Sequence, residues 1–292
     1  MSVQSLPTPH SLDLGRWPRR LALSIALFAG GCLAFLPYSL HTLVARDVRP
    51  VLWGGIALAF LAAALLARRS ARLQVYWRVI YALFVASAAS YADWFLSDWL
   101  PRLFNVPVQS LTGFGLAKLE SALVLGVCVI GLVKLSGEDL GSLYLKRGKV
   151  RWWLPIGLAA FSFFAITVIP AAMGLFQGRD VTWARILPWT PWILLFVLCN
   201  GFLEELNFRG LLLPRFQRHI GAAPAILVTS AVFSLAHIGA NYTPAILPFL
   251  VITFVLGLSF ATLIHKTDSL WGAVLFHAGA DIPVIVGIVS AM

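Results

Sequence analysis

Three ionisable side chains stand close together in an otherwise apolar stretch of the chain. Glu204, Glu205 and Arg209 all fall within residues 199–210. On an α-helix, residues four apart share a face, so Glu205 is expected to pair with Arg209 while Glu204 points about 100° away from that pair. Because one arginine cannot neutralise two glutamates, Glu204 is predicted to keep a carboxylate that can act as a general base.

Two later segments place histidines in apolar surroundings. His237 follows Phe233 by four residues, and Asp281 follows His277 at the same spacing. Each pair should therefore share a helix face, which lets the His277 imidazole and the Asp281 carboxylate orient each other. Ionisable groups inside a membrane are costly, and by default they indicate a functional site.

The rise of a helix indicates that these groups reach a similar depth. Glu204 precedes the expected end of its helix near residue 218 by 14 residues, and His237 follows the expected start of the next helix near residue 223 by 14. Each is then about 21 Å from that end at about 1.5 Å per residue, and His277 and Asp281 lie about 12 and 18 Å deep. Together they could hold a water, take its proton and stabilise an oxyanion.

The composition predicts that a membrane surrounds these groups. Of 292 residues, 60% are hydrophobic and 12% are charged, against about 25% charged in soluble domains. We therefore expect an all-α fold, a polytopic membrane bundle of eight or nine transmembrane helices that encloses an active-site cavity. The expected spans are residues 21–41, 51–67, 79–100, 113–135, 152–176, 190–213, 221–238, 245–264 and 270–291.

The basic residues predict the orientation. With the N-terminus inside, 15 Lys and Arg residues fall on the cytoplasmic side and six on the other, and positive charge is retained in the cytoplasm. The net charge of +10 then indicates loops that face an anionic lipid bilayer, with no nucleic acid as a partner. We expect an integral protein of a bacterial cytoplasmic membrane, with a cytoplasmic tail (1–20), N-terminal spans and an amphipathic loop (21–185) and a catalytic core (186–292).

Several other ionisable residues in or near the spans are interpreted as structural. These residues are Arg78, Asp93, Asp98, Lys118 and Glu120. We expect them to lie near span ends or to pair with one another.

The order of the three motifs resembles a known protease family. Glu204-Glu205-x-x-x-Arg209, Phe233-x-x-x-His237 and His277-x-x-x-Asp281 are similar to the signature of the CPBP family, the CAAX protease and bacteriocin-processing (Abi) family of glutamic intramembrane proteases. The resemblance covers about residues 190–285.

This resemblance implies a mechanism and a substrate class. Glu204 with His237 would activate a water that attacks a peptide bond of a membrane-associated protein or peptide, and Arg209 would organise the glutamates. His277 and the last motif residue would stabilise the oxyanion. That last residue is usually Asn in the family and is Asp281 here. Asp281 could be protonated or could accept a hydrogen bond from His277, and the second interpretation is favoured.

Other functions fit parts of the same pattern. A zinc-dependent version of the protease would use Glu204, His237 and His277 as ligands, although we expect no cofactor because no His-Glu-x-x-His motif is present. A non-catalytic bacteriocin-immunity protein could bind a peptide without cleaving it. A proton-coupled transporter is the least favoured, because repeated halves and broken helices are not evident in the sequence.

Overall fold

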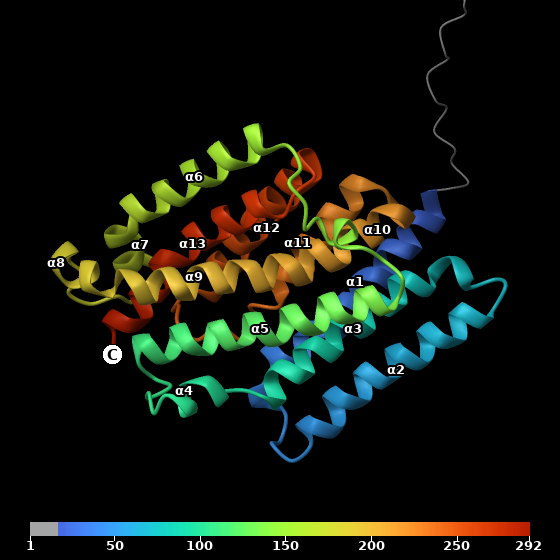
Figure 1. Cartoon of the computed structure of the whole chain (residues 1–292), viewed down its shortest axis with the longest axis horizontal. Coiled ribbons are helices and arrows are strands. Elements are labelled where there is room, and N and C mark those ends of the chain that lie inside the picture. The colour runs from blue at the N-terminus through green and yellow to red at the C-terminus, as the bar shows by residue number, and fades with distance from the viewer. Residues whose placement is uncertain (1–16) are drawn as a thin grey trace, which may run out of the picture.

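The computed structural model describes residues 17–292, and these residues form a bundle of helices without strands (Figure 1). Most of the expected tail, residues 1–16, lies outside the described residues. The helices are α1 (Trp17–Ser39), α2 (Arg49–Arg69), α3 (Trp77–Phe95), α4 (Trp99–Leu103), α5 (Leu111–Leu135), α6 (Val150–Ile166), α7 (Val168–Leu175), α8 (Trp183–Ile186), α9 (Thr190–Glu205), α10 (Leu213–Ile220), α11 (Ala222–Leu235), α12 (Ile246–Thr267) and α13 (Trp271–Ser290), with short turns η1 (His41–Leu43), η2 (Gln74–Tyr76), η3 (Leu140–Leu143) and η4 (Leu187–Trp189) and the π-helical segment η5 (Leu206–Leu212).

The lengths of these helices confirm an integral membrane protein. Seven helical stretches in the described part of the chain are long and apolar enough to cross a bilayer, and the bent pair α6 and α7 makes an eighth if it is one span. The expected seventh span is shorter than predicted, because α11 ends at Leu235 and has 14 residues. His237 consequently lies in the turn after the helix rather than on it.

The most deeply buried span is α13, which packs against α6, α7, α9 and α12 (Figure 1). Small residues allow this close packing. A Cβ added at Gly201 of α9 would lie 2.9 Å from the carbonyl oxygen of Val274 in α13, which is closer than a side chain tolerates. The backbones of α9 and α13 therefore approach each other directly beside Glu204 and His277.

The chain bends by 66° between α6 and α7. Pro170 stands in the first turn of α7 and has no N–H to donate to the preceding turn, which breaks the helical ladder at this point. The hydroxyl and the backbone N–H of Thr167 both donate to the Phe163 carbonyl oxygen, at 2.8 and 3.0 Å, where α6 ends.

A second proline accompanies the widening of the helix in η5. Pro214, at the start of α10, cannot donate to the carbonyl of Gly210, and its ring would crowd that carbonyl in a regular α-helix. The buried Arg215 side chain supplies the missing donors instead, at 2.7 Å to the Leu211 oxygen and 3.5 Å to the Gly210 oxygen. Such π-helical segments often occur at functional sites, and η5 carries Arg209.

Candidate active site

A cavity of about 690 Å³ opens among α5, α9, α12, α13 and the turn after α11. Most of its wall is apolar, and a small set of polar side chains converges on one part of it, as is typical of ligand-binding cavities. These side chains are Lys118, Asn200, Glu204, Asn207, His237, Tyr242, His277 and Asp281. The structure thus brings four of the six expected site residues, Glu204, His237, His277 and Asp281, from three separate segments to one cavity.

Glu205 and Arg209 form the buried base of the site. Their side chains are fully buried, and Arg209 Nη1 donates to Glu205 Oε1 at 2.9 Å. The same Glu205 oxygen lies 2.9 Å from His277 Nδ1. A carboxylate oxygen only accepts, so this contact places a proton on Nδ1 of His277 and directs its Nε2 toward the cavity.

Aromatic rings surround the rest of the Arg209 guanidinium. Its Cζ lies 4.2 Å from the ring centroid of Phe233, 5.7 Å from that of Phe208 and 5.6 Å from that of Phe260. Rings attract a cation through their negative faces, which partly replaces the water lost on burial. Gly257 makes room for this arrangement, because a Cβ there would lie 2.9 Å from Arg209 Nη2.

Glu204 points the other way, into the cavity. Its Oε2 atom lies 3.7 Å from His237 Nε2 and 3.6 Å from His277 Nε2. The Glu204 side chain keeps 17% of its surface exposed, whereas the neighbouring Glu205 keeps none. The two adjacent glutamates therefore have different surroundings, as their positions on the helix predicted.

The turn that follows α11 fixes the orientation of His237. Its Nδ1 lies 2.8 Å from the carbonyl oxygen of Phe233 and must donate to it, so the neutral ring presents an unprotonated Nε2 to Glu204. The Phe233 and His237 rings lie edge to face with centroids 4.8 Å apart. Although α11 ends before His237, the expected contact between these two residues is formed.

Asp281 is held by a residue from another helix. Its Oδ2 accepts from Asn200 Nδ2 at 2.8 Å and lies 3.6 Å from His277 Nε2, beyond hydrogen-bond distance. The expected acceptor for His277 was Asp281, but Glu205 takes that position at Nδ1. His277 and Asp281 share a face of α13 as predicted. The spacing along α13 could not reveal that Glu205, at the end of α9, lies closer to His277.

Four of these polar side chains of the cavity were missed or assigned elsewhere from the sequence, namely Lys118, Asn200, Asn207 and Tyr242. Asn200 precedes Glu204 by four residues and shares its face, and that spacing was the signal that could have identified it. Lys118 was expected near a span end or in a pair, but it lines the cavity and its Nζ lies 5.7 Å from the Phe196 ring centroid. By contrast, Asp98 does pair with a nearby base, Arg102, at 3.7 Å.

Tyr242, in the loop between α11 and α12, covers one side of the cavity. Burial and the nearby negative charges of Glu204 and Asp281 raise the pKa of Tyr242 above its usual value. Its phenol therefore stays protonated at neutral pH and can donate a hydrogen bond toward the cavity.

For the zinc alternative, residues 17–292 contain no group of three or more His, Cys, Asp or Glu side chains arranged to hold a metal ion.

Comparison with known proteins supplies one match. Residues 186–283 match the family model described as type II CAAX prenyl endopeptidase Rce1-like. The matched segment contains the three motifs, from Glu204 through Asp281, and it begins where the expected catalytic core begins. No curated protein and no solved structure matches the chain.

Proposed function

We propose that Glu204 and His237 activate the water of an intramembrane peptide hydrolysis, because residues 186–283 match the model of the Rce1-like type II CAAX prenyl endopeptidases. The observation that carries this proposal is the position of Glu204 Oε2, 3.7 Å from the unprotonated Nε2 of His237 within the cavity. Both atoms accept hydrogen bonds, so a water between them can donate to each and turn a lone pair toward a substrate carbonyl.

The reaction then needs a proton path and a charge acceptor. One water proton passes to the Glu204 and His237 pair as the water oxygen bonds to the carbonyl carbon. When the carbon–nitrogen bond breaks, the pair returns that proton to the departing amine. The candidate donors for the oxyanion are His277, as an imidazolium that carries a proton on Nε2 as well as on Nδ1, and the second N–H of the Asn200 amide. Glu205 fixes the orientation of His277, and Asp281 fixes that of Asn200.

The substrate is proposed from the family description. It is a membrane-associated protein whose C-terminal segment carries a prenylated cysteine, and the apolar walls of the cavity suit such a segment. Purified protein in lipid nanodiscs is incubated with a prenylated CAAX peptide, and the products are identified by mass spectrometry. Glu204→Gln should lower the rate by about 10²–10⁴, the usual effect of removing a general base.

A buried glutamate outside the cavity provides the matched control. Glu120 is 2% exposed and accepts from the backbone N–H of Leu100 at 2.7 Å, which a Gln oxygen can also do. Glu120→Gln should therefore keep the wild-type rate. A folded Glu204→Gln protein that cleaves the peptide at the wild-type rate would refute the mechanism, and comparison of membrane-protein termini from cells with either form would identify the natural substrate.

We also propose that the protease needs no metal ion, with zinc held by Glu204, His237 and His277 as the alternative. Among residues 17–292, no three His, Cys, Asp or Glu side chains are arranged to hold a metal ion, and this supports the metal-free proposal. Metal analysis of the purified protein and activity in EDTA distinguish the two. Loss of activity in EDTA that stoichiometric zinc restores would replace the metal-free proposal.

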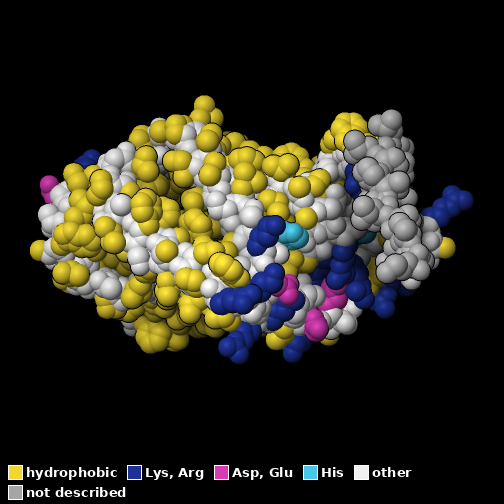
Figure 2. Space-filling model, turned by 90° about the horizontal axis from the view of Figure 1, so that it is seen from above, with side chains coloured by type: hydrophobic (Ala, Val, Ile, Leu, Met, Phe, Trp, Pro, Cys, Tyr) yellow, Lys and Arg dark blue, Asp and Glu magenta, His cyan; other side chains and the backbone are white. Residues whose placement is uncertain are grey.

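The N-terminus is proposed to be cytoplasmic. Basic residues that the sequence assigned to that side meet in the structure: Arg78, Arg215 and Arg218 all contact Glu138. Figure 2 shows Lys and Arg side chains gathered on one part of the surface, beside a mostly hydrophobic region. Reporter fusions after α2 and α5 should both give cytoplasmic signals, and a periplasmic signal from either would reverse the assignment.

A further inference from the structure

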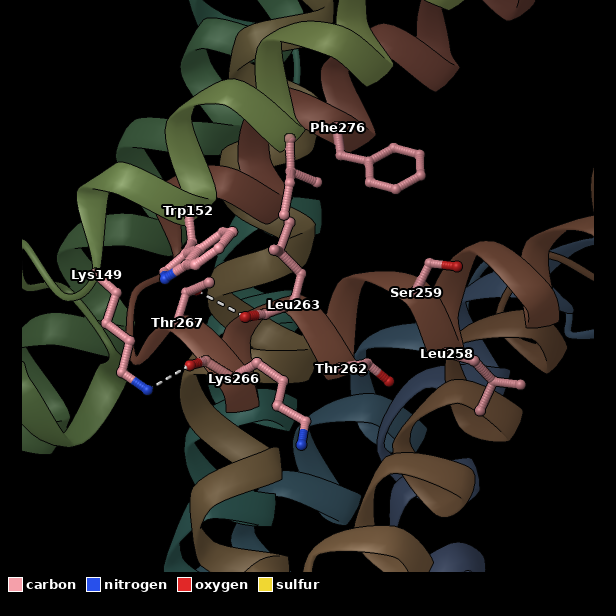
Figure 3. Close-up of a pocket in the computed structure, with 10 residues that line it drawn as sticks. Lys149, Trp152, Leu258, Ser259, Thr262, Leu263, Lys266, Thr267 and Phe276 are labelled. Carbon is pink, nitrogen blue, oxygen red and sulfur yellow. Dashed lines mark hydrogen bonds between the residues drawn. The ribbon is translucent and has the colours of Figure 1, made fainter.

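A second cavity, which we call the α6–α12 cavity, lies between α6 and α12 (Figure 3). Its volume is about 590 Å³, and none of the six expected site residues lines it. The helix α6 packs mainly along α13 and touches α12 at few places. The side chains of α6 and α12 leave the space between these two helices open, and this space is the cavity. It is therefore separate from the catalytic cavity.

One end of the α6–α12 cavity is cationic. Lys149 directly precedes α6, and Lys266 lies in the last turn of α12. Lys149 Nζ donates to the backbone oxygen of Lys266 at 2.9 Å, which leaves its other N–H donors available (Figure 3). Within residues 17–292, no carboxylate lies within 4.0 Å of either ammonium, and nearby Asp268 pairs with Lys146 at 2.7 Å.

The rest of the cavity is mostly apolar, with the hydroxyl groups of Ser259 and Thr262 beside Leu258 (Figure 3). Trp152, Leu258, Leu263 and Phe276 contribute to its wall, and Figure 3 shows Phe276 and Leu258 away from the two lysines. Leu258 precedes Lys266 by eight residues on α12, so the apolar wall extends about 12 Å along the helix from the cationic end. A ligand that fits both parts has an anionic head and a hydrocarbon chain.

We propose that the α6–α12 cavity binds an anionic phospholipid, with its phosphate at Lys149 and Lys266 and an acyl chain along Trp152 and Phe276. The two ammonium groups lie at the ends of their helices, where lipid headgroups meet a membrane protein. Basic pockets between membrane helices recognise such headgroups through charge. A zwitterionic headgroup carries its own cation, so it gains less from the two lysines.

The test measures lipid retention by the full chain. Protein purified in detergent is mixed with equal amounts of phosphatidylglycerol and phosphatidylcholine of the same acyl chains, and native mass spectrometry counts the bound lipids. Phosphatidylglycerol should be preferred by wild type. Because each lysine near the surface contributes about 1 kcal/mol to anionic lipid binding, either single change to Gln should weaken retention about fivefold, and Lys149→Gln with Lys266→Gln about 30-fold.

Lys134 offers a matched control. It lies in the last turn of α5, is exposed and lines none of the cavities described above. Lys134→Gln removes the same charge and should leave retention unchanged. The proposal is overturned if wild type retains the two lipids equally, if the double variant matches wild type, or if Lys134→Gln weakens retention as much as the double variant does.

Fluorescence provides a second measurement that does not depend on the lysine variants. Trp152 lines the cavity and is 55% exposed, so a brominated acyl chain in the α6–α12 cavity should quench its emission. The contribution of Trp152 is the difference in quenching between wild type and Trp152→Phe. This difference should be larger with brominated phosphatidylglycerol than with brominated phosphatidylcholine. Equal quenching by both lipids, or none that depends on Trp152, would overturn the proposal even if the double variant fails to fold.

Discussion

Replacing Glu205 by Gln should destabilise the protein far more than the same change at its neighbour Glu204. Glu205→Gln keeps the size of the side chain but removes the only carboxylate within 4.0 Å of the Arg209 guanidinium among the described residues. Both partners are fully buried. Breaking a buried ion pair leaves one charge uncompensated and typically costs about 3–5 kcal/mol of unfolding free energy.

Glu204 differs in each of these respects. Its side chain is 17% exposed, it faces a cavity, and the closest ionisable groups are the His277 and His237 imidazoles, with Nε2 atoms at 3.6 and 3.7 Å. Glu204→Gln should change the unfolding free energy by less than about 1 kcal/mol, in the range of substitutions that break no buried pair. The two adjacent glutamates thus separate a change in stability from a change in activity.

The measurement is reversible unfolding of purified protein in mixed micelles of increasing denaturing detergent, followed by loss of helical circular dichroism. A double variant, Glu205→Gln with Arg209→Met, completes a thermodynamic cycle because it removes both charges. The losses of unfolding free energy in Glu205→Gln and in Arg209→Met are measured separately and added. The double variant should be more stable than this sum predicts by at least about 2 kcal/mol. A loss below about 1 kcal/mol in Glu205→Gln, or strict additivity in the cycle, would refute the role assigned to the pair.

Three further predictions concern two groups at the site and one buried ion pair outside it. Gly257→Ala places a Cβ 2.9 Å from Arg209 Nη2 and should lower stability by about 1–3 kcal/mol through overpacking, measured by the same unfolding assay. Asp281→Asn removes a negative charge from the place where an oxyanion forms, so kcat in the peptide assay should stay the same or rise. Glu138→Gln removes the carboxylate that pairs with buried Arg215, and it should cost about 3–5 kcal/mol of unfolding free energy.

Controls for these predictions come from the same chain. A Cβ added at Gly131 of α5 would meet no atom within 4 Å, so Gly131→Ala should not destabilise the protein. A loss of kcat above about 100-fold in Asp281→Asn would show that its carboxylate takes part in the reaction. Unchanged stability of Glu138→Gln would show that the three arginines around it are compensated by water.

Local helix geometry allowed much of the site to be predicted from the sequence. The four-residue spacing of Glu205 and Arg209 placed them on one face, and their ion pair forms although part of it lies in the π-helical segment η5. The same spacing predicted that Phe233 contacts His237 and that Glu204 points elsewhere. Membrane spans were predictable because each needs about 20 apolar residues in a row. Two expected spans differ in the structure, because α11 has only 14 residues and the span expected at 152–176 bends by 66° between α6 and α7.

Contacts between helices required the tertiary structure, because spacing along one helix does not determine which side chains of another helix come closest. Glu205 rather than Asp281 accepts from His277 Nδ1, and Asn200 holds Asp281 across the gap between α9 and α13. Gly201 lets the backbones of α9 and α13 approach closely beside these contacts, because a Cβ there would lie 2.9 Å from the Val274 carbonyl oxygen. The sequence therefore determined which residue types face inward on each helix, and helix packing decided which of them meet.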